Sequence, residues 1–429
     1  MWSNSGARVE TFPAIRPLRH FPHMYLRRLN DFTWDFFLMD PSRLSMLHHV
    51  RDQTQRWDIY ALRYPGRALA RFRLHQWLED RVEKLVVAHN RSPEAVERLR
   101  VLRPDLILST GTFRYEEPAV VAAAKRLRIP VLAFVTSWDN ISIKNRMVLK
   151  YDGYLVWSKR MKGELHEYYP ESRRVPVYIV GAPQFDVFFD PAFCMSREEF
   201  CAGLGLDFRK PVIVHAMGVA NGVEEHHGAL DLARRLCNGE IGEAQLIVRP
   251  HPFHNQRELR DMFLPFGPRV VVQQNALGEA RNVRSQDNQE TANWINTFRH
   301  ADVIVHLSST VAIDGALFDR PSVCMDYDPT PGQPRQALVK EVNHRWTHYT
   351  PVAQSGGMWL VNNPDELIQA IRAYLADPAL HRIERRKMAE YVCEYLDGGC
   401  GQRMVTAIAD FMNLRLTKTQ SLPDQVYAC

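Results

Sequence analysis

The sequence lacks the cysteine pairs and the long apolar runs that mark several classes of protein. Its seven cysteines are scattered over 429 residues without a CxxC pair, and the odd number argues against a disulfide framework. No stretch reaches the roughly 18 to 20 consecutive apolar residues of a membrane span, and no signal-peptide pattern opens the chain. These absences argue against a secreted disulfide scaffold and a membrane-spanning protein. They favour the cytoplasm, with free and mostly buried thiols.

An excess of charge of one sign is also missing. Lys and Arg number 54 against 49 Asp and Glu, so the formal net charge is only +5, and no clustered basic face is evident. Binding of nucleic acid would need such a face. The small excess fits a protein that handles phosphorylated small molecules or touches an anionic membrane surface. Residues 16–28, rich in Arg, His and aromatics, fit a membrane-facing or acceptor-facing surface as well as a solvated irregular segment.

Common signatures of metal sites, nucleotide sites and nucleophilic catalysis are absent as well. The chain has no Walker or GxGxxG fingerprint, no nucleophile elbow, and no His, Cys and Asp cluster with metal-site spacing. His254 and the adjacent pair His226 and His227 fit surface histidines better than ligands. The sequence therefore predicts no protein-held metal and no cofactor.

What the chain does have is an alternation of short apolar runs with helical patterns. Its length predicts two domains of about 180 to 220 residues each. Strands separated by helices pair in parallel with right-handed crossovers, so the predicted fold class is α/β, with two Rossmann-like domains. Strands are expected at 105–109, 130–135, 153–157, 177–180, 211–216, 245–248, 269–272, 303–307, 322–325 and 359–361.

Breaks in the alternation set the expected domain boundaries. Residues 1–65 form an irregular or helical N-terminal extension, and residues 66–185 form the first α/β domain. Residues 186–395 form the second, and residues 396–429 form a helix and tail that cross back onto the first domain. A helical pattern is expected from Gly66 to Ala88, because its apolar residues recur on one face.

The strongest candidate site follows the apolar run at 303–307. Ser308, Ser309 and Thr310 come next, and a helical pattern begins directly after them. The first turn of a helix leaves N–H groups without partners, and its dipole favours negative charge, so this strand, turn and helix start predict an anion site. Asp314, about one turn into the helix, is placed to accept hydrogen bonds from a sugar or glycerol hydroxyl. The alternative is that Ser309 or Thr310 only caps the helix.

A second candidate is Arg249-Pro250-His251-Pro252, directly after the strand at 245–248. The prolines fix the backbone, the Arg249 fork suits phosphate, and His251 offers a donor. The alternative is a structural Arg249 salt bridge with a histidine filling a turn. Gly218, in the loop after the strand at 211–216, allows close backbone approach to a phosphate or base.

In the first half, the loop after the strand at 130–135 carries the best candidate for a general base, Asp139. Trp138 beside it is able to lower the local dielectric or stack on a ring, and Ser137 and Asn140 complete an acceptor-binding segment. The alternative is an ordinary turn, since Asp and Asn are common turn formers.

Several short motifs, in order, carry a resemblance to a known family. The chain resembles the GT-B glycosyltransferase superfamily, and more closely its bacterial surface-polysaccharide branch related to CDP-glycerol glycerophosphotransferases. The resemblance spans about Leu99 to Met412. Its motifs are Arg103-Pro104-Asp105, Ser137-Trp138-Asp139-Asn140, Val156-Trp157-Ser158, Gly181-Ala182-Pro183-Gln184-Phe185-Asp186, Arg249-Pro250-His251-Pro252, Ser308-Ser309-Thr310 with Asp314, and Asp397-Gly398.

The resemblance implies a GT-B architecture, with two domains facing a cleft, the donor nucleotide held by the second domain and the acceptor by the first. Arg249, His251 and residues 308–310 would bind the donor's diphosphate, and Asp314 a ribose or donor hydroxyl. The implied activity is a metal-independent glycosyltransferase, which moves a glycosyl or glycerophosphoryl group from a nucleotide-sugar or CDP-glycerol-like donor. The acceptor would be a glycan or lipid-linked molecule, in the cytoplasm or at the inner face of the membrane.

Two alternatives to a transferase stay open. One is an enzyme of the same architecture, a nucleotide-sugar 2-epimerase, and the other is a non-catalytic nucleotide-sugar-binding scaffold. The chain also departs from the resemblance in two places. In the glycerophosphotransferases a His-Gly pair follows the first-domain strand and contributes the base, whereas Ser137-Trp138-Asp139 stands there in this chain. Residues 1–65 show no clear opening strand and glycine-rich turn, which predicts a late start or a reduced first domain.

Overall fold

The computed structural model describes residues 23–45, 57–88, 92–113, 117–147, 149–218, 223–252, 254–273, 288–332 and 336–420. The chain divides into two compact units. The first comprises residues 1–183, 393–395 and 399–429, and the second comprises residues 184–392 and 396–398. Within the described ranges, no helix combines the length and the apolar character that crossing a bilayer requires.

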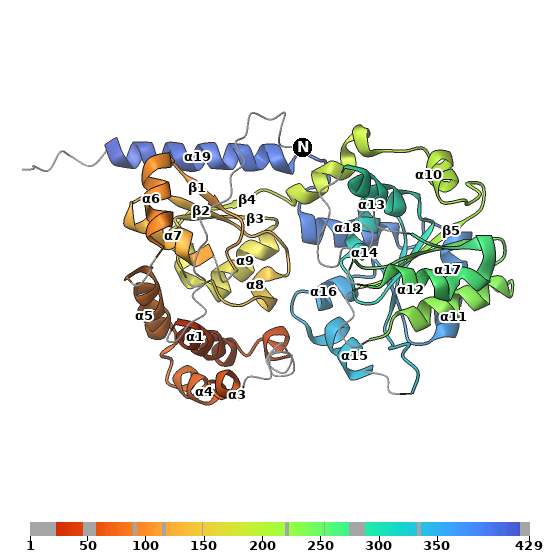
Figure 1. The fold of residues 1–429 in the computed structure, drawn as a ribbon, viewed down its shortest axis with the longest axis horizontal. Coiled ribbons are helices and arrows are strands. Elements are labelled where there is room, and N and C mark those ends of the chain that lie inside the picture. The colour runs from red at the N-terminus through yellow and green to blue at the C-terminus, as the bar shows by residue number, and fades with distance from the viewer. Residues whose placement is uncertain are drawn as a thin grey trace, which may run out of the picture. The chain divides into compact units, whose positions relative to one another are not determined.

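A four-stranded parallel sheet forms the centre of the first unit, in the order β1-β2-β3-β4 (Figure 1). Its strands are β1 (Ile107–Ser109), β2 (Val131–Phe134), β3 (Gly153–Val156) and β4 (Val177–Ile179). The helices of this unit are α1 (His23–Leu38), α3 (Trp57–Tyr60), α4 (Arg63–Arg71), α5 (His75–Ala88), α6 (Pro93–Leu102), α7 (Glu117–Arg126), α8 (Asn140–Ile143), α9 (Lys159–Tyr168), the 3-10 helix η1 (Pro170–Arg174) and α19 (Cys400–Gln420).

The last helix, α19, returns to the first unit and covers one face of its sheet. Ala407 and Phe411 of α19 join a buried cluster with side chains of β2 and β3. Gly153 in β3 makes this approach possible, because a Cβ there would lie 3.0 Å from the Phe411 ring. Gly181, which follows β4 and has a φ of 81°, lies against the first residue of α19. A Cβ on it would lie 2.4 Å from Cys400 Sγ. Both glycines therefore let the helix pack against the sheet.

A six-stranded parallel sheet forms the centre of the second unit, in the order β10-β9-β8-β5-β6-β7. Its strands are β5 (Val212–Ala216), β6 (Gln245–Arg249), β7 (Val270–Val272), β8 (Val303–His306), β9 (Ser322–Met325) and β10 (Trp359–Val361). The helices are α10 (Arg197–Gly203), α11 (His226–Cys237), α12 (Gln256–Phe263), α13 (Asn288–His300), α14 (Val311–Leu317), α15 (Gln336–Arg345), α16 (Thr350–Ala353), α17 (Pro364–Ala376) and α18 (Arg382–Cys393), with 3-10 helices η2 (Pro183–Phe189), η3 (Pro191–Phe193) and η4 (Leu264–Arg269).

Both faces of the second sheet are covered, as a parallel sheet requires. Every residue of β5 is buried, and alternate residues enter two different cores. Ile213 packs with side chains of α11 and α17, whereas Val212 and Val214 pack with side chains of α10 and α13. Figure 1 shows these two pairs of helices on opposite sides of β5. Burying each such aliphatic side chain contributes about 1.5 to 3 kcal/mol, so these two cores hold the strand ends in fixed positions.

All ten strands lie where the sequence predicts them, within two residues at each end. The predicted fold class, α/β with two Rossmann-like domains and a returning C-terminal helix, is confirmed by the two parallel sheets and α19. The helical pattern expected from Gly66 to Ala88 is confirmed for most of its length, but it is divided into two helices, α4 and α5. Arg73 between them has a φ of 55°, which interrupts the helix.

Two arginines of the basic segment 16–28 face the interior of the protein. Arg27 is buried, and Arg28 donates to Asn145 Oδ1 at 2.9 Å and lies 3.6 Å from Asp31. These two side chains therefore do not belong to the exposed basic surface that the sequence suggested. Residues 16–22 lie outside the described ranges.

Candidate functional site

The residues predicted to bind a donor follow three adjacent strands of the second unit. Because β8, β5 and β6 are neighbours and run parallel, their carboxyl ends share one edge of the sheet. The predicted residues at this edge are Gly218 after β5, Arg249 and His251 at the end of β6, and Ser308, Ser309 and Thr310 after β8. Ligands of open α/β sheets bind beyond such ends.

Arg249 is the last residue of β6 rather than part of the turn that follows, and its side chain is buried. Its Nη2 donates to Glu290 Oε1 at 2.8 Å, and its Nη1 donates to Gln273 Oε1 at 2.6 Å and to Thr297 Oγ1 at 3.3 Å. Arg249 thus forms a salt bridge with Glu290, as expected if its role is structural rather than phosphate binding. His251 is half-buried, and its carbonyl accepts the N–H of His254 at 2.9 Å.

One tryptophan brings Arg249 and Asp314 together. The Arg249 guanidinium lies over the Trp294 ring, 4.7 Å from its centroid, and Trp294 Nε1 donates to Asp314 Oδ1 at 3.2 Å. Asp314 lies in α14 with only 5% of its surface exposed. Its role toward a donor hydroxyl stays a prediction, and one of its oxygens already accepts a hydrogen bond from Trp294.

Hydrogen bonds to other residues of the second unit hold the turn after β8. Ser308 has a φ of 42°, and its Oγ donates to Asn343 Oδ1 at 2.8 Å. The Ser309 carbonyl accepts from Tyr349 OH at 3.2 Å, and Ser309 Oγ accepts weakly from the N–H of Val311 at 3.4 Å. Thr310 is exposed and makes no capping hydrogen bond. Thr310 therefore offers the most accessible hydroxyl of the three.

A polar network around Asp326 supports this turn, and sequence reasoning did not single it out. Asp326 follows β9 directly and accepts from Asn343 at 2.9 Å, Lys340 at 2.6 Å and His344 at 2.7 Å. Burial raises the pKa of Asp326, but these hydrogen bonds outweigh it and hold the pKa below its ordinary value. Through Asn343, the network reaches Ser308 Oγ. The signal in the sequence was an acidic residue directly after a strand.

The backbone of Gly218 is also engaged. Its N–H donates to both carboxyl oxygens of Glu225, at 3.1 and 3.2 Å, and His254 Nε2 lies 2.9 Å from its carbonyl oxygen. Glu225 is buried, and burial raises its pKa to about 8 despite the Gly218 hydrogen bond. A Cβ at Gly218 would lie 3.0 Å from Glu225 Oε1, so a larger residue would crowd this contact.

Two buried histidines lie just inside the same edge, His215 in β5 and His306 in β8. Both ring nitrogens of His215 have no hydrogen-bond partner among the described residues. Burial lowers the pKa of His215 to about 4, and burial with the nearby His215 lowers that of His306 to about 3. Each ring is therefore neutral in the folded protein near pH 7.

Because His215 is buried as a neutral ring, we expect the free energy of unfolding to fall in acid, and we expect His215→Leu to reduce this fall. Between pH 6.5 and 4 the unfolded chain binds a proton at His215 and the folded chain does not, so stability falls as the pH drops through that window. Between pH 7.5 and pH 5, protonation of His215 in the unfolded chain lowers the free energy of unfolding by about 2 kcal/mol. Urea unfolding at both pH values is expected to show a correspondingly smaller loss in the variant. An equal loss in both proteins would contradict the assignment.

The first unit holds the predicted acceptor-binding residues after β2. Ser137 Oγ donates to Asp139 Oδ1, and Asn140 Nδ2 donates to Thr136 Oγ1 at 3.3 Å. Asp139 is half-buried and precedes the short helix α8, without a side-chain capping bond. Ser137 and Asp139 are thus brought into contact, and the hydroxyl fixes one oxygen of the candidate base.

A second carboxyl group lies near Asp139. Glu164 in α9 pairs with Arg160, whose Nη2 donates to the carbonyl of the buried Trp138. Burial raises the pKa of Glu164 to about 7, against the lowering effect of Arg160, and the charges of Asp40 and Asp139 add to the rise. The sequence did not indicate Glu164, because a single Glu on a helix facing a loop carries no local pattern.

The N-terminal helical part of the first unit holds the loop that carries Asp139. Arg43 is buried, pairs with Asp35 at 2.5 Å, and donates to the carbonyl of Ile141 at 3.2 Å and of Lys144 at 3.1 Å. These two carbonyls lie in and directly after α8. The predicted N-terminal extension therefore helps to fix the candidate acceptor loop.

Comparison with known proteins gives matches only at the level of structure. No protein-family model and no curated protein matches the sequence. A putative UDP-N-acetylglucosamine 2-epimerase from Listeria monocytogenes is 14% identical, with a TM-score of 0.49, over 78% of this chain and 80% of that chain. A glycosyltransferase from Rickettsia africae is 12% identical, with a TM-score of 0.47, over 77% and 81%. The wall teichoic acid polymerase TagF is 12% identical, with a TM-score of 0.47, over 73% of each chain.

Proposed function

We propose that this protein transfers a glycosyl or glycerophosphoryl group from a nucleotide-activated donor to a glycan or lipid-linked acceptor of surface polysaccharide. One observation carries the proposal: Gly218, Arg249 and the Ser308–Thr310 turn lie at the carboxyl ends of three adjacent parallel strands. In doubly wound sheets ligands bind beyond such ends, and hydroxyl and amide donors suit a diphosphate.

The residues at this edge of the sheet fall into two groups. Some contact the donor, and others hold neighbouring side chains in place. We assign direct contact with the diphosphate to Thr310, Ser309 and His251, because Thr310 is exposed and the other two are only half-buried. Arg249 is buried and already paired with Glu290, so we assign it to holding Trp294 and, through it, Asp314.

In the first unit, Asp139 would take the proton from the acceptor hydroxyl as that oxygen attacks the donor. Ser137 orients the carboxylate by donating to one of its oxygens, which leaves the other for the acceptor. Charge then develops on the leaving nucleotide, which is a nucleoside diphosphate in glycosyl transfer and a nucleoside monophosphate in glycerophosphoryl transfer, and fixed donors at the edge of the second sheet stabilise it. We place this reaction in the cytoplasm.

Calorimetry of the full chain against UDP, CDP, GDP and CMP tests the donor site. A nucleoside diphosphate is expected to bind more tightly than CMP, and Thr310→Val is expected to weaken that binding by about 1.5 kcal/mol, the loss of one hydrogen bond to a charged group. Thr310 caps nothing, so the fold should be unaffected. Lys210→Ala, at the amino end of β5, serves as the control. Failure of every nucleotide to bind would contradict the donor site.

An epimerase is the second candidate, because Glu164 pairs with Arg160, which donates to the carbonyl of Trp138, the residue before Asp139, so the first unit holds two carboxyl groups around one loop. Proton removal and return at one sugar carbon needs such acid and base groups. Mass spectrometry of UDP-N-acetylglucosamine incubated with the protein in D₂O separates the candidates. Deuterium in recovered nucleotide sugar without any acceptor would favour epimerisation, whereas consumption only with an acceptor would favour transfer. Binding without turnover would favour a scaffold.

A further inference from the structure

Three potential metal ligands meet at the start of α11 in the second unit. His227 Nε2 lies 3.1 Å from Glu224 Oε2, and the ring centroids of His226 and His227 are 4.2 Å apart. One ligand atom from each of the three residues lies within 4.8 Å of the other two. Ligand atoms at 2.0 to 2.1 Å from a tetrahedral zinc ion are about 3.3 Å from one another. Small side-chain rotations would therefore bring all three onto one ion.

The chemistry and the exposure of this cluster suit a metal that enters from solution. The side chains of His227 and Glu224 are 32% and 57% exposed. Imidazole with a carboxylate is a ligand set that zinc and its neighbours in the first transition series prefer over magnesium.

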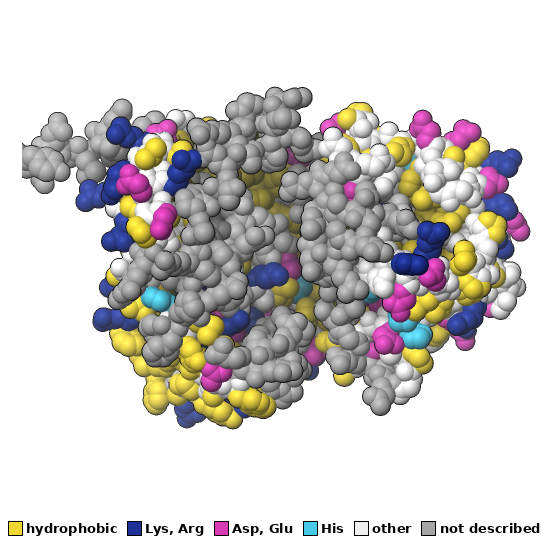
Figure 2. All heavy atoms as spheres, viewed as in Figure 1, with side chains coloured by type: hydrophobic (Ala, Val, Ile, Leu, Met, Phe, Trp, Pro, Cys, Tyr) yellow, Lys and Arg dark blue, Asp and Glu magenta, His cyan; other side chains and the backbone are white. Residues whose placement is uncertain are grey.

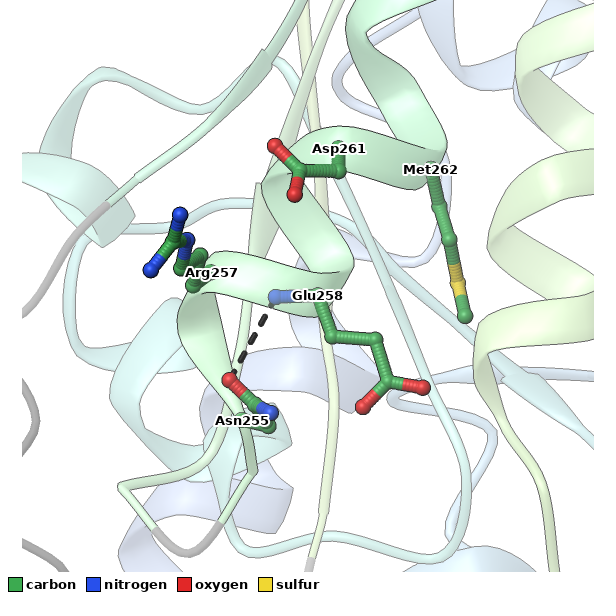
Figure 3. Close-up of a pocket in the computed structure, with 5 residues that line it drawn as sticks. All are labelled: Asn255, Arg257, Glu258, Asp261 and Met262. Atoms are coloured by element: carbon green, nitrogen blue, oxygen red, sulfur yellow. Dashed lines mark hydrogen bonds between the residues drawn. The ribbon is translucent and has the colours of Figure 1, made fainter.

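A further histidine lies close to the segment before α11. His254, which precedes α12, has its Nε2 2.9 Å from the carbonyl oxygen of Gly218, whose N–H donates to Glu225. Figure 2 shows histidine side chains beside acidic ones on this face of the second unit. Figure 3 shows Glu258 on the first turn of α12, where it lines a surface depression of about 520 Å³. The other residues that line it are Asn255, Arg257, Asp261 and Met262.

We propose that Glu224, His226 and His227 bind one divalent transition-metal ion of the zinc class. The sequence favoured surface histidines here over metal ligands. The structure differs because Glu224 precedes α11, where the chain is not yet helical, so its carboxylate turns back to His227. None of these three residues is assigned to the donor or the acceptor, so the proposal goes beyond the proposed function.

Zinc titration of the metal-stripped full chain in a calorimeter tests the site. The wild type is expected to show a binding step of one zinc ion per chain that His226→Ala/His227→Ala abolishes and Glu224→Gln weakens. His166→Ala, on α9 of the first unit, serves as a matched control and should retain the step. Cysteine thiols would bind zinc equally in every variant, so the difference between variants reports on the histidines.

Zinc binding by the double variant that equals that of the wild type would overturn the proposal. All three substitutions lie on partly exposed side chains, and thermal unfolding of each variant checks that the fold is retained. Titration of the same variants with UDP reports on the proposed function alone. A wild type that binds zinc but no nucleotide would therefore support the metal site and contradict the donor site.

Discussion

Arg146→Met is expected to destabilise the first unit by about 3 to 5 kcal/mol, the usual effect of breaking a fully buried ion pair. Arg146 has no exposed surface, and its Nε and Nη2 donate to the two carboxyl oxygens of Glu79 in α5, at 2.5 and 3.2 Å. Its guanidinium also lies 3.4 Å from the centre of the Trp34 ring and 4.2 Å from that of Tyr169. One side chain therefore joins α1, α5 and the end of α9.

The loss comes mainly from the carboxylate left behind. Glu79 would stay buried without a positive partner, and desolvated charge is costly. Urea unfolding of Arg146→Met measures the effect, and Arg146→Met/Glu79→Met should recover part of it because both charges are gone. Arg100→Met is the matched control, since Arg100 pairs with Glu97 on the exposed surface and should change stability by less than about 1 kcal/mol. Equal effects at both arginines would contradict the interpretation.

Arg249→Met is expected to destabilise the second unit by about 3 kcal/mol, for a related reason. The substitution removes the charge that pairs with Glu290 and the donors that satisfy Gln273 and Thr297. It also removes the cation that lies on Trp294, the residue that donates to Asp314. The variant is thus expected to lose stability whether or not a nucleotide is present.

Comparison with Arg209→Met and with nucleotide binding completes this test. Arg209 pairs with Asp207 on the surface of the same unit, so its removal should have little effect. If Arg249 contacted the donor directly, Arg249→Met would abolish nucleotide binding while unfolding like the wild type. That result would contradict the supporting role assigned to Arg249 and favour the phosphate fork that the sequence suggested.

The positions of the strands could be predicted because their signal is local. Each strand is a short run of apolar residues between polar turns, and burial on both faces of a parallel sheet demands such a run. Residues at the carboxyl ends of these runs necessarily share an edge once the strands are parallel, which is why Gly218, Arg249 and Ser308 could be grouped from the sequence. The break at Arg73 was missed, since one residue with positive φ leaves the apolar spacing on either side unchanged.

The partners of the charged residues could not be predicted in the same way. Glu290 lies 41 positions from Arg249, Glu79 lies 67 positions from Arg146, and Asn343 lies 35 positions from Ser308. No spacing rule links such residues, because their contact depends on how helices and strands pack. The roles of Arg249 and of the Ser308–Thr310 turn therefore needed the structure.

The sequence by itself determined the α/β alternation, the ten strands and the sheet edge at which candidate site residues gather, because apolar periodicity and parallel pairing act over short segments. Only the tertiary structure decided which side chains remain accessible there. Arg249 is buried in an ion pair while Thr310 is exposed, and Glu224 turns back onto two histidines. The physical reason is that burial and charge pairing are properties of packed elements, which distant segments create together.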